Sequence, residues 1–456
     1  MARLMRWATD AGGRWQLDME SPVTMEGTAR PVPLDPPSLL GLSRGPRITR
    51  TKQLDFMHRF MSAPLVPSFC AADGGFFMHH AHLKHLTDKL SATILDQFDM
   101  QKLLSSIKES VSKGKGEASW SEFISSRVRD IMTIGAATEL QISSSMTLLV
   151  EAFNINREQG RGKAIFQHKF AKHSLTMEAA CPSLFVDKMG SYWDVPLLLG
   201  FDLASIGSGS GLSYHLCLHH LKGDPKPLHS EENNRDVPVS VPASLFPGTC
   251  AKVAISFKRN FDLWREKEGK VKMVQPYDVL LSDPHVSASC TFGGVASGSI
   301  HDSSSEFYTE KNKHAFLGDL FGSLSLTAQH GNFQRLFFDL TRLSTRLDFN
   351  SGSAFFKGAT QLGKDLYHSQ PLDLAAVHAV CPDVIVSLQQ QIVGPFSFRM
   401  DSKITIDPRN KNQIARIDES VLAIDWALQV LGSAKATAWY SPLRKEGMVE
   451  LRFFEI

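Results

Sequence analysis

The sequence lacks the long apolar runs that transmembrane helices require. It contains no stretch of about 18 consecutive apolar residues, and its mean hydropathy of -0.13 is too low for a bundle of membrane helices. The longest apolar run, residues 195–204, is broken by Pro196, Gly200 and Asp202. A transmembrane β-barrel is compatible with these values, because the apolar face of its strands alternates with polar residues.

A strong charge of either sign and paired cysteines are also missing. The 456 residues carry a net charge of +2, which gives no reason to expect nucleic-acid binding. The six cysteines show no CxxC spacing, so neither a zinc site nor a disulfide framework is indicated. We therefore expect free thiols and no nucleic-acid partner.

The N-terminus shows no targeting peptide. Arg6 is followed by Asp10 and Asp18 without an intervening apolar segment, which does not fit a secretory signal. The early acidic residues, which also include Glu20, argue against a transit peptide. We expect neither kind of leader.

No catalytic centre is recognisable. The glycine-rich residues 207–211 have Gly209 where a nucleophile elbow has serine, and no helical pattern follows as it would in a phosphate loop. We interpret this segment as a hairpin turn. No acid/base pair and no Ser/His/Asp arrangement stands out, so we expect no enzyme, no catalytic residues and no cofactor.

Two groups of histidines, within residues 79–85 and 215–220, could in principle bind a metal ion. The first group has no carboxylate neighbour before Asp88. In the second, strand alternation predicts that His215 and His219 share one face and that His220 lies on the other. We expect exposed or lumen-facing histidines and no metal site.

The first 139 residues predict an N-terminal arm with short amphipathic helices. Residues 31–46 are rich in proline and glycine, which predicts an extended segment with turns. Apolar residues at helical spacing then predict three short helices, at residues 53–61, 99–110 and 120–134.

Basic residues lie beside these helices without acidic neighbours. Such residues next to short amphipathic segments suit anionic lipid head groups, and a phosphomonoester offers the most charge and acceptor oxygens. An ordinary solvated surface is the alternative. The candidate lipid-binding residues are Arg44, Arg47, Arg50, Lys52, Lys102, Lys108, Lys113 and Lys115.

From residue 140 the hydrophobic period becomes strand-like. Soluble strands usually have about five or six residues, whereas membrane strands need about nine to eleven, and several alternating runs reach the longer length. We therefore predict an all-β chain in which residues 140–456 form an outer-membrane-type antiparallel β-barrel of about 14–16 strands. A soluble β-sandwich or lipocalin-like barrel is the alternative on this pattern.

Residues 396–407 show the clearest alternation and define the two faces. The apolar residues of this run should point outward, namely Phe396, Phe398, Met400, Ile404 and Ile406. The charged residues between them should point into the lumen and pair across strands, namely Arg399, Asp401 and Lys403. On this interpretation leucine at Arg399 would leave assembly nearly intact.

Several long blocks resemble one known family. They include residues 213–220 (SYHLCLHH), 337–342 (FFDLTR), 387–399 (SLQQQIVGPFSFR) and 448–455 (MVELRFFE). Together with blocks near the N-terminus they resemble the trigalactosyldiacylglycerol 4 family of plants. The resemblance runs from end to end and thins between about residues 70 and 160.

The resemblance implies a non-enzymatic β-barrel of the chloroplast outer envelope that binds phosphatidic acid and related membrane lipids. It implies transfer of lipid from the endoplasmic reticulum to the plastid, a homodimer, contact sites with the endoplasmic reticulum, and plastid lipid-transporter components as partners. The alternatives are a lipid-modifying enzyme on a barrel scaffold and a soluble lipocalin-like lipid carrier. The candidate basic residues come from the sequence pattern and not from the resemblance.

Overall fold

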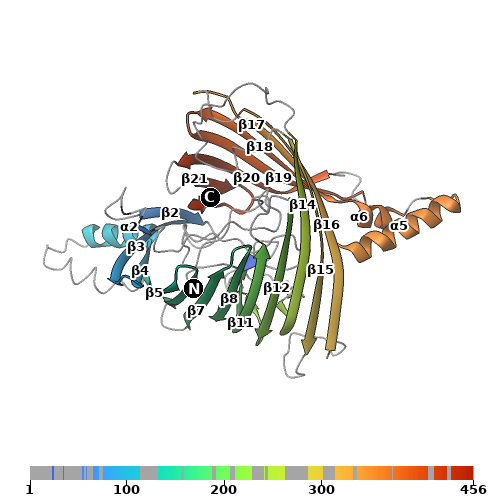
Figure 1. The fold of residues 1–456 in the computed structure, drawn as a ribbon. Helices are drawn as coiled ribbons and strands as arrows, with labels where there is room; N and C mark the ends of the chain where they lie inside the picture. Colours follow the sequence, from blue (N-terminus) through green and yellow to red (C-terminus); the bar gives the residue numbers. More distant parts are fainter. Residues whose placement is uncertain are drawn as a thin grey trace.

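Among the described residues, 18 strands close into one antiparallel β-barrel (Figure 1). The structure is a computed structural model, and it describes residues 23–24, 34, 54–55, 58, 65–70, 75–112, 132–155, 159–186, 192–205, 211–227, 241, 245–261, 286–300, 314–331, 336–371, 373–408, 415–428 and 433–454. Among the described helices, none is long and apolar enough to cross a bilayer.

Each barrel strand pairs with the next one along the chain, and the last pairs with the first. In this order the strands are β2 (Leu65–Cys70), β3 (Gly75–Thr87), β4 (Leu90–Asp99), β5 (Met132–Ser143), β6 (Met146–Ile155), β7 (Gln159–Lys169), β8 (His173–Cys181), β11 (Leu197–Ser205), β12 (Leu212–Lys222), β14 (Gly248–Phe261), β15 (Val286–Ile300), β16 (His314–His330), β17 (Thr341–Phe349), β18 (Asp383–Val393), β19 (Phe396–Ile406), β20 (Ala415–Leu428), β21 (Ser433–Ser441) and β22 (Glu446–Phe454).

The barrel begins well before residue 140, so the domain boundary drawn from the sequence is wrong. Strands β2, β3 and β4 precede it, and β5 starts at Met132. In β3 histidines occupy both faces, with His79 buried and His80 half-buried, so no clean apolar alternation is visible there. The expected 14–16 strands are too few, because these early strands were assigned to the arm.

The alternation of the strands gives the barrel two chemically different faces. On β19, Arg399 and Asp401 are buried on the lumen side, whereas Phe396 and Met400 are exposed on the outside. This confirms the predicted orientation of β19. Large apolar side chains are exposed on the outer face of many other strands, for example Ile94, Val150, Leu218, Ile255 and Leu326. The chain is thus an outer-membrane-type β-barrel with an apolar outer face.

Helix α2 (Met100–Ser112) follows β4 and confirms the helix expected near residues 99–110. Its first turn is capped by Asp99, whose Oδ1 accepts a hydrogen bond from the backbone N–H of Lys102 at 3.0 Å. The last residues of the helix expected at 120–134 belong to β5 instead. The rest of that segment, and most of residues 53–61, lie outside the described residues.

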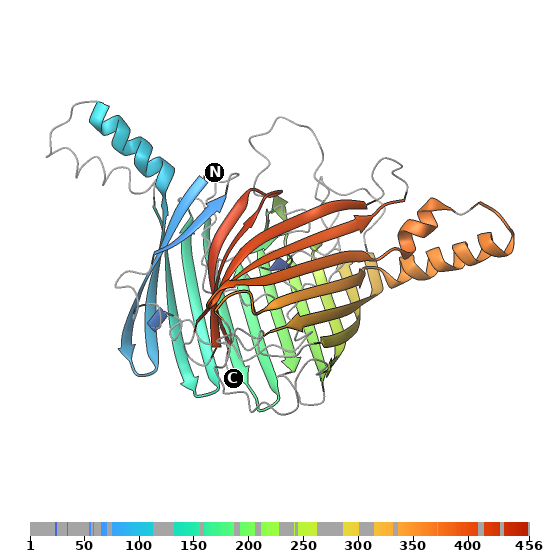
Figure 2. The ribbon, with the colours of Figure 1, turned by 90° about the horizontal axis from the view of Figure 1, so that it is seen from above.

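A helical hairpin between β17 and β18 was not expected from the sequence. It consists of α5 (Gly352–Tyr367) and α6 (Leu374–Val380) and projects from the barrel, as α2 does (Figure 2). Ser351 caps α5 by accepting a hydrogen bond from the backbone N–H of Ala354 at 3.0 Å. Because β4 and β17 run in the same direction, both excursions leave the same end of the barrel.

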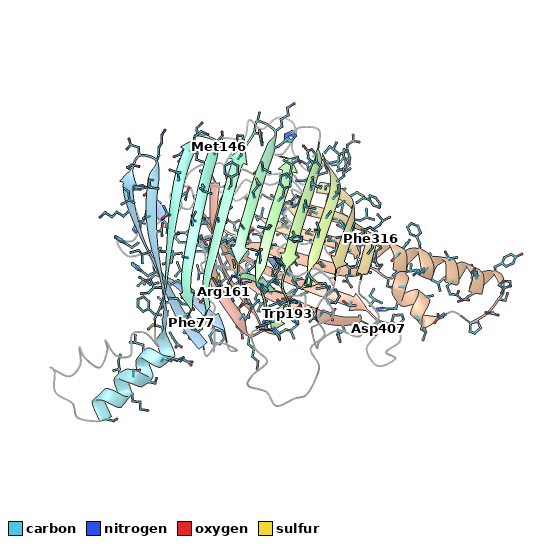
Figure 3. The ribbon with its side chains drawn as sticks, turned by 90° about the horizontal axis from the view of Figure 1, so that it is seen from below. Phe77, Met146, Arg161, Trp193, Phe316 and Asp407 are labelled. Carbon is cyan, nitrogen blue, oxygen red and sulfur yellow. The ribbon has the colours of Figure 1, made fainter. Side chains whose placement is uncertain are left out.

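A small four-stranded sheet packs against the inside of the wall. Its strands are β1 (Val23–Thr24), β9 (Ser183–Val186), β10 (Tyr192–Val195) and β13 (Lys226–Pro227), in the order β1-β9-β10-β13. Phe185 and Trp193 of this sheet pack with Leu198 and Leu221 of the barrel. Figure 3 shows Trp193 and Arg161 at the end of the barrel opposite Met146.

Candidate functional site

Lumen-facing side chains of β18–β21 form a buried polar network. Asp425 is its centre: its Oδ2 accepts from Gln389 Nε2 at 3.1 Å and its Oδ1 accepts from Thr437 Oγ1 at 2.6 Å. Arg399 Nε lies 3.3 Å from Asp425 Oδ2, and Arg399 Nη1 lies 3.5 Å from Asp401 Oδ2. The guanidinium of Arg399 therefore lies within 3.5 Å of two buried carboxylates of this polar network.

The lumen-facing charges of β19 pair as the sequence predicted. Lys403 Nζ of β19 lies 2.9 Å from Asp383 Oδ2 of β18, and Arg399 pairs with Asp425 of β20. Alternation places charges of both signs on the inner face. Neighbouring strands then bring opposite charges within ion-pair distance. Charged side chains on the polar face of β19 thus form ion pairs with neighbouring strands inside the barrel.

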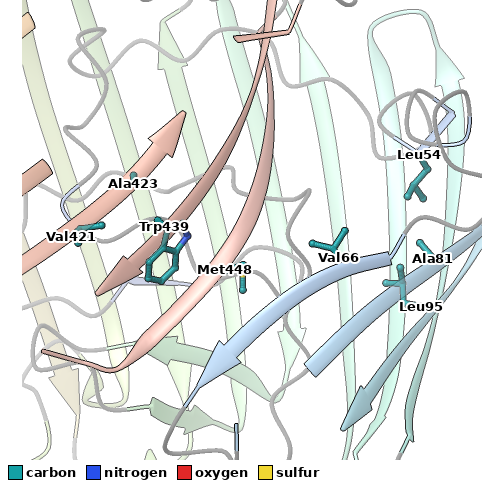
Figure 4. Packing of buried hydrophobic residues seen from close by; sticks show 8 residues of the cluster. All are labelled: Leu54, Val66, Ala81, Leu95, Val421, Ala423, Trp439 and Met448. Carbon is teal, nitrogen blue, oxygen red and sulfur yellow. The ribbon is translucent and has the colours of Figure 1, made fainter. Parts of the chain in front are cut away.

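A patch of apolar side chains also faces the lumen, which is unusual for the inner wall of a membrane barrel. We call it the apolar lumen patch. It spans β20, β21, β22, β2, β3 and β4, and Leu54 packs onto it from the chain that precedes β2 (Figure 4). Its buried members are Leu54, Val66, Ala81, Leu95, Val421, Ala423, Trp439 and Met448.

The polar network and the apolar lumen patch are direct neighbours. Arg399 is the register partner of Ala423, and Ala423 is the register partner of Trp439. The same lumen-facing row continues from Trp439 to Met448 and then to Ser68. The inner wall is therefore amphipathic along this row, and it can contact a polar group and an apolar chain of one ligand simultaneously.

A second set of buried charges lies near the small sheet. Arg161 Nη2 of β7 lies 3.0 Å from Asp194 Oδ2 of β10, and Lys163 Nζ lies 3.0 Å from Glu178 Oε1. Burial raises the pKa of the Asp194 carboxyl, and the charge of Arg161 opposes that rise. The Arg161–Asp194 pair ties the small sheet to the barrel wall.

Two of the eight basic residues expected to bind lipid lie in the described part of the chain. Lys102 and Lys108 are both exposed on α2, and Lys102 Nζ is 3.9 Å from Asp99 Oδ2. The six others lie outside the described residues, namely Arg44, Arg47, Arg50, Lys52, Lys113 and Lys115. Their role as one lipid site therefore stays a prediction.

Strand alternation divides the histidines between the two faces. His79 is fully buried, and its Nε2 lies 2.7 Å from Ser68 Oγ at the edge of the apolar lumen patch. His215 and His219 are buried on the lumen side and His220 is exposed, as predicted. Within the described ranges, no group of three His, Cys, Asp or Glu residues is arranged to hold a metal ion.

Sequence reasoning missed the apolar lumen patch. A recognisable signal was present on β20, where Val421 and Ala423 occupy positions of the same parity as Asp425. The lumen-facing positions of this strand therefore include both apolar and polar residues. Leu54, in contrast, could not be placed, because its contact with Leu95 joins segments that no local pattern connects.

Three comparisons place this geometry among known proteins. No protein-family model matches the chain. The chain is 45% identical over 482 aligned positions to "Protein TRIGALACTOSYLDIACYLGLYCEROL 4, chloroplastic" of Arabidopsis thaliana, with 99% of each chain covered.

The solved structures to which the chain is similar include three Pseudomonas aeruginosa proteins at 8% identity. OccK9 (OpdG) has a TM-score of 0.37 and covers 86% of this chain and 95% of its own. OpdL has a TM-score of 0.32, with 85% and 93% covered. OccK11 (OpdR) has a TM-score of 0.34, with 85% and 90% covered.

Proposed function

The chain belongs to the trigalactosyldiacylglycerol 4 family, and from that premise we propose that it transports membrane lipid across the chloroplast outer envelope. The observation that supports this most is the amphipathic inner wall. A glycerolipid has a polar head and apolar tails, and the row from Arg399 to Met448 offers a polar and an apolar surface side by side.

Phosphatidic acid is the lipid that we propose as ligand. Its phosphomonoester carries a high negative charge and several acceptor oxygens. Basic side chains beside an anionic membrane surface are suitable partners for such a group. We therefore assign its recognition to the basic N-terminal residues, of which Lys102 and Lys108 are exposed on a helix that projects from the barrel.

The family resemblance supports finer assignments, which we include in the proposal. Lipid moves from the endoplasmic reticulum towards the plastid, at contact sites between the two membranes. The protein acts as a homodimer together with plastid lipid-transporter components. It works without catalysis, so incubation of the purified chain with phosphatidic acid should release neither diacylglycerol nor free fatty acid.

Transport is tested with the full chain reconstituted in liposomes and fluorescent phosphatidic acid supplied by donor vesicles. Trp439→Gln places a polar group in the apolar lumen patch and should slow transfer. Trp426→Gln is the matched control, because Trp426 lies on the neighbouring strand, is exposed on the outer face and stacks on Phe396. Equal transfer by both variants and the parent, or no transfer by any of them, would contradict lipid transport through the lumen.

Membrane integration is tested separately. Carbonate extraction of isolated envelope membranes should leave the chain in the pellet, because the outer face of the barrel exposes large apolar side chains such as Ile94 and Leu326. Release into the supernatant would favour the soluble carrier. A lipid-modifying enzyme would be revealed by diacylglycerol or fatty acid in the incubation described above.

A further inference from the structure

The barrel closes between β22 and β2, and this closing junction is the shortest junction between described strands of the barrel. Three register pairs join the two strands: Ser68 with Met448, Phe69 with Gly447, and Cys70 with Glu446. The other junctions have from 6 to 15 register pairs in the described residues. Separating β22 from β2 therefore breaks fewer ladder hydrogen bonds than opening the wall elsewhere.

The strand edges beside the closing junction are long. Residues 449–454 of β22 pair with β21 on one side, and residues 81–87 of β3 pair with β4. Within the described residues, neither of these segments is paired with β2. In the described part of the chain, β22 and β3 thus extend past the ladders that join them to β2.

A pocket of about 360 Å³ extends over β19–β22 and across the closing junction to β2 and β3. This volume falls within the range of about 300–1,000 Å³ that is usual for ligand pockets. Residues of both faces contribute to its lining: Trp439 and Met448 are buried on the lumen side, whereas Phe76 and Tyr440 are exposed on the outside. Small outward-facing residues, Ala438 among them, leave room between the larger side chains.

The lumen side of the closing junction is apolar as well. Met448 and Val66, from the two strands that meet there, belong to the apolar lumen patch. On the strands across the barrel the corresponding inward positions are polar, for example Thr291 and Ser323. An acyl chain that enters between β22 and β2 thus finds an apolar surface outside the wall, within it and behind it.

We propose that the closing junction is a lateral opening through which the acyl chains of a bilayer glycerolipid pass between the lumen and the surrounding membrane. The proposal rests on the lipid transport proposed above and gives it a route. The polar head group stays on the lumen side, where Ser68 and His79 present polar atoms behind the junction. The other barrel junctions have at least 6 register pairs, and β14–β15 and β15–β16 have 14 and 15, so the tails find no comparably short ladder there.

A disulfide across the closing junction tests the opening. In a chain whose six native cysteines are replaced by serine, Ser68→Cys and Met448→Cys are introduced at register partners that are both buried on the lumen side. Directly opposed residues lie about 4.5–5.5 Å apart between Cα atoms, within the range of disulfides. The matched control is Thr291→Cys with Ser323→Cys, which are lumen-facing register partners of β15 and β16.

The oxidised Ser68→Cys/Met448→Cys variant should transfer fluorescent lipid between vesicles at least about tenfold more slowly than its reduced form, a difference in barrier of about 1.4 kcal/mol. Reductant should restore the rate, and the control disulfide should not change it. Transfer at equal rates in the oxidised and reduced forms would overturn the lateral opening while leaving lipid transport intact. Absence of transfer in the parent chain would instead contradict the proposed function.

A second measurement, photolabelling, tests the lateral opening independently of lipid transfer. A phosphatidylcholine with a photoreactive group on its acyl chain is placed in the bilayer around the reconstituted chain. It should label the lumen-facing residues Trp439 and Met448 in the reduced variant and lose this labelling on oxidation. Labelling confined to outward-facing residues such as Ile424 and Tyr440 in both forms would overturn the proposal.

If the cysteine variant does not assemble, a substitution that fills the pocket tests the lateral opening instead. Ala438→Phe adds a large side chain to the pocket from the outer face, and it should lower acyl labelling of Met448 at least about fivefold. Ala136→Phe is the matched control, because Ala136 is an exposed outward-facing residue of β5. Undiminished labelling of Met448 in an assembled Ala438→Phe barrel would overturn the proposal.

Discussion

Arg399 and Trp439 are both register partners of Ala423, so a buried guanidinium and a buried indole flank one small residue in a single lumen-facing row. The row crosses from the polar network on β19 to the apolar lumen patch on β21 within three neighbouring strands. A glycerolipid can therefore contact the polar network with its head group and the apolar lumen patch with its tails at the same time.

The outer face of β19 should not accept a charge. Phe398→Arg places a guanidinium on the lipid side, which costs about 2–4 kcal/mol near the bilayer midplane. We expect impaired membrane assembly, measured as loss of the heat-modifiable, protease-resistant form on gels. Phe398→Leu keeps the face apolar and should assemble normally; equal behaviour of the two variants would contradict the register of β19.

Arg399→Leu should also destabilise the barrel, contrary to the expectation from the sequence. The guanidinium lies 3.3 Å from Asp425 and 3.5 Å from Asp401, so its removal takes a cation away from two buried carboxylates. Breaking a buried ion pair from one side typically costs about 3–5 kcal/mol. Thermal unfolding in detergent should show this loss.

Adding Asp425→Asn to Arg399→Leu removes one of the two carboxylate charges. The amide retains an oxygen that can accept from Thr437, so the double variant should recover part of the lost stability. If the double variant is less stable than Arg399→Leu alone, the charge balance argued for the polar network is wrong.

Alternation predicted the long strands and the two faces of β19 because it is local and the period of a strand is two. The choice of a membrane barrel over a soluble β-sandwich came from the family resemblance. Prediction from the sequence failed where apolar and polar residues do not alternate clearly. In β3, histidines on both faces hid the strand, and this moved the expected barrel start from residue 65 to residue 140. The apolar lumen patch escaped because Leu54, Leu95 and Trp439 come together only when the barrel closes.

The Arg161–Asp194 ion pair should hold the small sheet against the wall. Arg161→Met leaves the buried Asp194 carboxylate without its partner at 3.0 Å, and we expect a loss of about 3–5 kcal/mol in unfolding free energy. The double variant Arg161→Met/Asp194→Leu replaces both charges with apolar groups and should be more stable than Arg161→Met. A double-mutant cycle in thermal unfolding measures this, and purely additive effects would contradict a direct coupling.

Binding of phosphatidic acid should depend on the basic N-terminal residues rather than on basic residues in general. Replacing Arg44, Arg47, Arg50 and Lys52 together by glutamine should lower recovery with phosphatidic acid vesicles in a pull-down, while recovery with phosphatidylcholine vesicles stays near background. Because part of the attraction is screened, binding by the parent chain should weaken as salt rises. A quadruple variant that binds as well as the parent would place the site elsewhere, in the lumen.

The two exposed lysines of α2 allow a matched version of this experiment on residues that the structure describes. Lys102→Gln/Lys108→Gln should weaken binding to phosphatidic acid vesicles, though less than the quadruple variant, because each surface charge near an anionic membrane contributes about 1 kcal/mol. Lys357→Gln/Lys364→Gln removes two exposed lysines from α5, another helix that projects from the same end of the barrel. If both double variants lose the same affinity, attraction is a property of the overall charge of this end, and the assignment of the head group to the N-terminal arm is wrong.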